Sequence, residues 1–300
     1  MFLKKFLYLE ISADFFLFAE ISSEKMNLKG ERVLEVAISG DGELLVIKFD
    51  QKPYLRVVKC KDPHTLHCEL PDGGPDLSFF FADQTSYDLV VETPSSAIIV
   101  NAKSGKLVRK LGRKTSIDFV MSSSIGGRYL AVCTFDDGGL YCWDLKLGDL
   151  SRVPLPENKE ALIDSACVSP NGIHVAVCYQ DTPPMIVSVI TGKVILKLDV
   201  PWATGVEYSL DGKLLVTLGE EVAVWETDTG KLRYKDKLSV PAEAVFTPEN
   251  DLVVALSGVG AFLVGADKLL KSEDRIALSP GGKFVVFYNH HNIEVTQFNV

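Results

Sequence analysis

The chain has 300 residues and a net charge of −9 at neutral pH, and 47% of its residues are hydrophobic. This is the composition of an ordinary globular protein, and the negative charge argues against binding to nucleic acid or to an anionic membrane surface. No apolar run approaches the ~20 residues of a membrane span, and Glu10 interrupts the short apolar run after Lys4 and Lys5, which argues against a secretory signal.

From residue 31 onward, a turn followed by an apolar strand recurs along the chain. The last turn residue before each strand is, in chain order, Gly42, Tyr87, Gly127, Gly172, Gly212, Asn250 and Gly282. These positions are 32 to 45 residues apart, close to the ~40–45 residues of a four-stranded propeller blade. Glycine or asparagine suits such a turn because it adopts positive φ at little cost, so Tyr87 marks the least regular repeat. A second turn, as in Thr191-Gly192-Lys193, follows 18 to 21 residues later in four repeats.

The strands between these turns are almost continuously apolar, which is typical of strands buried on both faces. We therefore predict an all-β fold, a β-propeller of about seven four-stranded blades over residues 31–300. The predicted blades begin near Val33, Asp76, Ile117, Ile163, Gly205, Ala242 and Arg275.

The last repeat has three predicted strands and no fourth. The N-terminal segment, residues 1–30, can supply the missing outer strand and close the ring, which would remove exposed edges. The alternative is that the chain is a piece of a longer protein and that residues 1–30 are a degraded or foreign blade. The sequence leaves both readings open.

The segment 136–144, Asp-Asp-Gly-Gly-Leu-Tyr-Cys-Trp-Asp, resembles the end of a WD repeat, including the dipeptide Trp143-Asp144. In that family an aspartate before the Trp strand holds the blade through hydrogen bonds with a serine and a histidine, so the resemblance implies this role for Asp137. The Gly-His dipeptide of that family is absent, which argues against regular WD-repeat geometry but not against a propeller.

The chain is also similar to degenerate propellers that follow a NACHT-type nucleotide-binding module in large signalling proteins. That resemblance implies a sensor or autoinhibitory role, with the ATPase elsewhere.

Six cysteines are present, four of them inside strand-like runs. Buried free cysteine is common, so we expect reduced thiols and a cytoplasmic location, with a cross-strand bond between Cys133 and Cys142 left open.

No catalytic, cofactor or metal site is predicted. The sequence has no phosphate-binding loop, no nucleophile elbow and no zinc-protease motif. Cys60, His64, His67 and Cys68 lie within nine positions, but their spacing fits no zinc finger, and neighbouring strand residues face opposite sides.

Partner binding is predicted for the connections from the outer strand of one blade to the inner strand of the next, which share one face of a propeller. The candidate residues in these loops are Arg113, Lys114, Glu157, Lys159, Trp202 and Glu243. Trp202 stands out because tryptophan is enriched at interface hot spots. The sequence thus predicts a non-enzymatic scaffold or sensor for protein or peptide partners. The alternative is a lactonase-like or quinoprotein-like enzyme with a metal or cofactor at the central funnel.

Overall fold

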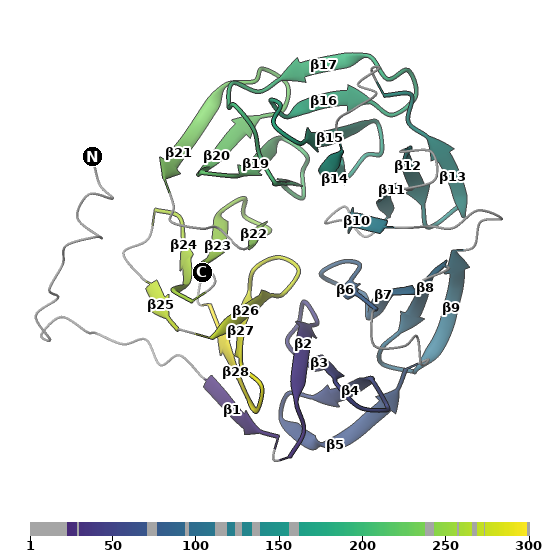
Figure 1. The fold of residues 1–300 in the computed structure, drawn as a ribbon, viewed down its shortest axis with the longest axis vertical. Coiled ribbons are helices and arrows are strands. Elements are labelled where there is room, and N and C mark those ends of the chain that lie inside the picture. The colour runs from purple at the N-terminus through teal and green to yellow at the C-terminus, as the bar shows by residue number, and fades with distance from the viewer. Residues whose placement is uncertain are drawn as a thin grey trace, which may run out of the picture.

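The computed structural model of the protein describes residues 23–28, 30–70, 77–93, 96–111, 119–123, 128–133, 139–155, 162–237, 243–256, 258–265, 269–272 and 274–298. These residues form seven four-stranded antiparallel sheets, arranged as the blades of a disc (Figure 1). The predicted all-β propeller is therefore confirmed. The described residues contain no helix, and so none that could cross a membrane.

Each blade runs from an inner strand at the centre of the disc to an outer strand at its rim (Figure 1). The first three blades contain β2 (Val33–Ile38), β3 (Leu44–Phe49), β4 (Leu55–Lys59) and β5 (Asp62–Glu69); β6 (Phe79–Phe81), β7 (Asp88–Thr93), β8 (Ser96–Asn101) and β9 (Lys106–Leu111); and β10 (Phe119–Ser123), β11 (Tyr129–Cys133), β12 (Leu140–Asp144) and β13 (Asp149–Arg152). Blades 4 and 5 contain β14 (Ile163–Val168), β15 (His174–Tyr179), β16 (Met185–Ser188) and β17 (Val194–Lys197); and β18 (Gly205–Tyr208), β19 (Leu214–Leu218), β20 (Glu221–Glu226) and β21 (Leu232–Lys237). Blades 6 and 7 contain β22 (Glu243–Phe246), β23 (Leu252–Leu256), β24 (Gly260–Leu263) and β25 (Leu269–Lys271); and β26 (Arg275–Leu278), β27 (Phe284–Tyr288), β28 (Asn292–Gln297) and β1 (Ser23–Asn27). The inner strands begin at or within three residues of the predicted blade starts.

The antiparallel order gives the disc two different faces. Turns between the first and second strands, and between the third and fourth, lie at one end of the strands, which we call the turn face. The turns between the second and third strands and the connections to the next blade lie at the opposite end, the linker face.

The core of the molecule lies in the seams between blades. The described residues form seven buried apolar clusters, and each contains side chains from two neighbouring blades. The second strand of a blade is therefore buried on both sides, as in β23, where all five residues are buried. This packing explains why the sequence shows apolar runs rather than an alternating pattern.

The first turn of three blades shares one hydrogen-bond pattern, which explains the sequence repeat. In blade 1 the Ser39 hydroxyl donates to Asp41 Oδ1 over 2.7 Å and accepts from the Leu44 amide over 3.0 Å. Ser169 with Asn171, and Ser209 with Asp211, repeat this arrangement. Burying the serine hydroxyl is tolerated because both of its hydrogen-bonding roles are satisfied.

The irregular repeat at Tyr87 replaces glycine with an aspartate-centred turn. Asp83 Oδ1 accepts hydrogen bonds from the amides of Thr85 (2.6 Å) and Ser86 (2.5 Å). An aspartate side chain can stabilise a turn in this way without a residue at positive φ. The second blade therefore forms although its turn lacks the expected glycine.

The ring is closed by the N-terminal strand. β1 pairs antiparallel with β28, with Met26 opposite Ile293, and becomes the outer strand of blade 7 (Figure 1). Met26 and Leu28 are buried in the cluster that joins blades 7 and 1. The first of the two readings left open by the sequence, closure by the N-terminal segment, is thus confirmed. Residues 1–22 lie outside the described residues.

Cys133 and Cys142 form no disulfide, and neither do Cys60, Cys167 and Cys178. In the register of β11 and β12, Cys142 lies opposite Ala131 and Cys133 opposite Leu140, so the two thiols are not cross-strand partners. The disulfide that the sequence left open is absent from the structure.

Candidate functional site

Trp202 lies in the connection between β17 and β18, on the linker face. Its side chain is half-buried and packs on the turn between β19 and β20, where a Cβ atom added to Gly219 would lie 3.7 Å from Trp202 Cε3. Trp202 lines a small hollow whose other lining residues are Val200, Pro201, Thr217, Glu220 and Glu221. Part of the indole therefore rests on the blade while part remains available at the surface.

Glu243 was predicted to lie in a connecting loop, but this placement is wrong. It is the first residue of the inner strand β22 and is half-buried. Its Oε2 accepts a hydrogen bond of 3.2 Å from the backbone amide of Leu278, in the inner strand of the next blade. The side chain thus links two inner strands.

The other predicted loop residues, Arg113, Lys114, Glu157 and Lys159, lie outside the described residues. Asp137, to which the resemblance assigned the blade-holding role, also lies outside the described part of the chain.

Trp143 lies in the core between two blades, and Asp144 stabilises a turn. Trp143 is 4% exposed and lies in the cluster that joins blades 2 and 3. Asp144 Oδ1 accepts from the amides of Lys146 (2.9 Å) and Leu147 (3.0 Å), and its Oδ2 pairs with Arg128 over 2.9 Å. Partial burial opposes ionisation of Asp144, but these bonds outweigh it and lower its pKa. Asp144 therefore holds the turn that follows the Trp strand.

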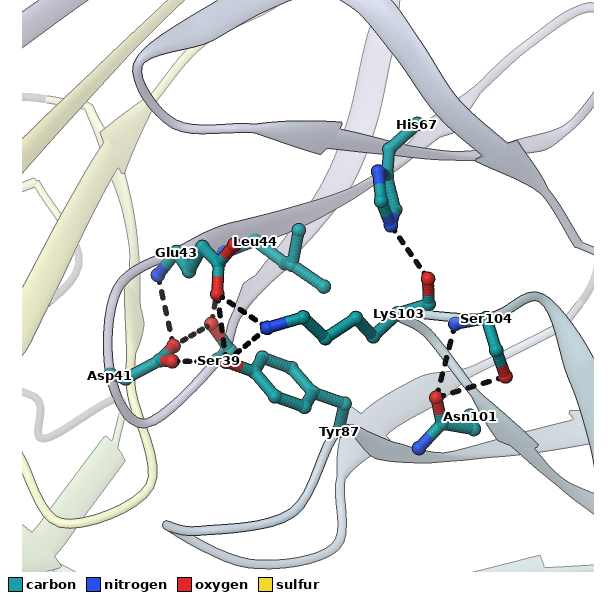
Figure 2. Close-up of polar contacts among 9 residues, drawn as sticks. All are labelled: Ser39, Asp41, Glu43, Leu44, His67, Tyr87, Asn101, Lys103 and Ser104. Carbon is teal, nitrogen blue, oxygen red and sulfur yellow. Dashed lines mark hydrogen bonds and ion pairs between the residues drawn. The ribbon is translucent and has the colours of Figure 1, made fainter.

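A polar network joins blades 1 and 2 on the turn face (Figure 2). The Tyr87 hydroxyl lies within hydrogen-bonding reach of Asp41 and is 2.8 Å from Glu43 Oε2. Lys103 Nζ donates to Glu43 over 2.9 Å and lies 4.4 Å from the centre of the Tyr87 ring. His67 extends the network, since its Nε2 is 2.7 Å from the Lys103 carbonyl oxygen (Figure 2). Sequence reasoning missed this group because its members come from separate turns and strands of two blades.

The electrostatics of this network favour a structural role. Hydrogen bonding to Asp41 raises the pKa of Tyr87 to about 12. Hydrogen bonds from Lys103 and Tyr87 lower the pKa of Glu43, and the bond to Glu43 raises that of Lys103. A general acid or base works best with a pKa near the working pH, and these shifts move each group away from neutrality. We therefore interpret the network as a clamp across the seam.

Two glutamates on inner strands have pKa values near neutrality. Burial raises the pKa of Glu207, on β18, to about 8, and the nearby charge of Glu243 adds to this effect. Burial likewise raises the pKa of Glu243 to about 7. No motif marks Glu207 in the sequence, so only the packing of the inner strands reveals it. Within the described part of the chain, no three His, Cys, Asp or Glu side chains gather as they would around a metal ion.

The raised pKa of Glu207 has a testable effect on stability. Between the usual pKa of a glutamate, 4.5, and the folded value of about 8, the folded chain binds a proton that the unfolded chain has lost. Stability should therefore fall as the pH rises through this interval. Glu207→Gln keeps the neutral form at every pH, so we expect it to be about 1–3 kcal/mol more stable than the wild type at pH 8.5, and this gain to disappear at pH 4.5.

Urea unfolding at the two pH values measures this difference. Glu220→Gln, an exposed change on the linker face, is the matched control and should alter stability by less than about 0.5 kcal/mol at both. A Glu207→Gln effect that does not change with pH would contradict the assignment.

No protein-family model and no curated protein matches this chain. Its function must therefore be inferred from the fold and from the residues described above.

Proposed function

We propose that this chain is a non-enzymatic interaction scaffold that binds protein or peptide partners on its linker face. The observation that carries the proposal is the half-buried Trp202, which borders a hollow beside the turn between β19 and β20. Tryptophan in such a position offers a large apolar contact area at low entropic cost. The blades beneath it are packed through their seams, so a partner would meet a preorganised surface.

The role of Trp202 can be tested by truncating it. Tagged wild-type protein and Trp202→Ala would be expressed in cells, and captured proteins quantified by mass spectrometry. We expect at least one partner to fall about tenfold with Trp202→Ala, as for an interface hot spot. Because the indole is only half-buried, the melting temperature should fall by less than about 4 °C.

Ile190→Ala provides the matched control. Ile190 is 81% exposed in a turn on the opposite face, so this variant also removes surface apolar area. It should retain the partners that Trp202→Ala loses. Unchanged capture by Trp202→Ala, together with a large loss of thermal stability, would show that Trp202 is a core residue and would contradict the proposal.

The alternative function is a propeller enzyme with a metal or cofactor at the centre of the disc. Glu207 and Glu243 are the observation that favours it, because they lie on inner strands and have pKa values near neutrality. We prefer the scaffold because Glu243 is engaged by the Leu278 amide. Stoichiometric calcium or zinc that survives dialysis of the purified protein would support the enzyme instead.

We also propose a WD-repeat-like ancestry and a cytoplasmic location. The Trp143-Asp144 dipeptide at the end of a blade strand supports the first. The thiols, none of which forms a disulfide among the described cysteines, support the second, since desolvation raises the pKa of Cys60 and Cys133 to about 12 and so disfavours the reactive thiolate. The link to NACHT-type signalling proteins rests on resemblance. Sequencing the intact transcript tests it, because an upstream phosphate-binding loop in the same reading frame would support the link.

A further inference from the structure

The outer strand of blade 2, β9, differs from the other outer strands in its charge. Three of its six residues are cationic, namely Lys106, Arg109 and Lys110, and none is acidic. This strand belongs to a chain whose net charge is −9. No described residue forms an ion pair with these three cations, whereas Arg233 and Lys235 on the outer strand of blade 5 pair with glutamates.

β9 also exposes apolar side chains at the rim of the disc. Leu107 is 57% exposed and Val108 52% exposed. The register explains this pair, because Ile99 lies opposite Arg109 while Val100 lies opposite Leu107, so Val108 is an extra, bulged residue. A bulge interrupts the alternation of side chains, and two consecutive apolar residues reach the surface as a result.

The backbone of β9 offers hydrogen-bonding groups along the same edge. β9 ends its sheet, and no described strand pairs with its outer side (Figure 1). The outward N–H and C=O groups of an edge strand are a template for another extended chain. A bulged edge fits a flexible peptide better than the rigid sheet edge of a second copy of this chain, because bulges disfavour edge-to-edge pairing of sheets.

We propose that β9 binds an extended, acidic peptide segment that adds a strand to blade 2. The peptide backbone would pair with the outer edge. Lys106 lies opposite Asn101 and Lys110 opposite Ile98, three residues apart on β8, so the two lysines face opposite sides of blade 2 and the peptide would present a carboxylate on each side. Its apolar residues would cover Leu107 and Val108. The charge of β9 supplies the complementarity that selects an acidic partner. This surface lies apart from Trp202, so the inference extends the proposed function to a second site and does not depend on the first.

A defined peptide tests the proposal. The probe is a fluorescein-labelled, acetylated eight-residue peptide in which pairs of glutamates alternate with pairs of valines, so that each face of its strand carries both residue types. Binding to the full chain is followed by fluorescence anisotropy. We expect Lys106→Glu with Lys110→Glu to weaken binding at least tenfold. The matched control, Lys193→Glu with Lys231→Glu, makes the same charge change at exposed turn-face lysines and should change affinity less than twofold. Trp202→Ala should bind the probe as the wild type does, which separates this site from the linker-face site.

The backbone pairing has its own readout. Bound probe should slow amide hydrogen exchange in residues 106–110, and a probe N-methylated at alternate residues, which lacks those donors, should not bind. Equal weakening by both double variants, or equal binding of the N-methylated probe, would overturn strand addition in favour of non-specific charge attraction. Binding to phosphatidylserine vesicles without binding to the peptide would overturn the acidic-peptide partner in favour of a lipid surface.

Discussion

Met26→Asp is expected to destabilise the protein by at least about 3 kcal/mol, because it places an unpaired carboxylate in the seam that closes the ring. Met26 is 3% exposed and packs with residues of blades 7 and 1. Met26 lies in β1, the N-terminal strand that pairs with β28 and so closes the ring. Opening this pair would also leave β28 with a free edge, so the variant should associate at high concentration.

Two variants of the same strand serve as controls. Lys25→Ala removes only an exposed ion pair with Glu294 and should cost less than about 1 kcal/mol. Met26→Leu conserves volume and polarity and should cost less than about 1.5 kcal/mol. Urea unfolding measures stability and size-exclusion chromatography measures association. If Met26→Asp costs no more than Lys25→Ala, β1 does not close the ring in solution.

The fold was predictable because the same local chemistry repeats along the chain. The turn that ends at Gly42 recurs at Gly172 and Gly212, all at φ of +70 to +74°. Asn250 also has positive φ, at 69°, as its residue type predicted. Turn chemistry and apolar strands are local signals, and local signals with a fixed period are enough to identify a propeller.

The candidate sites were much less predictable because they depend on contacts between blades. Glu243 was predicted to lie in a loop because the end of a loop and the start of a short strand look alike in sequence. In the structure it is the first residue of β22, and from there its side chain reaches the Leu278 amide. The link from Asp41 to Tyr87 spans 46 residues and follows only from the alignment of two blades. Tyr87 was noticed as an irregular turn residue, but the sequence could not show that it joins the seam.

Gly42→Ala and Gly172→Ala are each expected to cost about 2–4 kcal/mol, whereas Gly212→Ala should cost about 1 kcal/mol. The three glycines occupy the same turn position with nearly the same positive φ, so the backbone penalty should be similar. They differ in what covers them. An added Cβ at Gly42 would lie 2.5 Å from the Phe284 ring, while at Gly212 its nearest neighbour is Pro170 Cδ at 3.4 Å.

The aromatic ring over the glycine comes from the preceding blade in both crowded cases. Phe284 of blade 7 covers Gly42 of blade 1, and Tyr129 of blade 3 covers Gly172 of blade 4. The excess cost should therefore reflect packing between blades, and a double-mutant cycle isolates it. Phe284→Leu should recover at least about 1 kcal/mol in the Gly42→Ala background, measured by urea unfolding. Equal costs at all three glycines, with no recovery, would mean that the penalty is only that of the backbone and that the rings do not fix the seams.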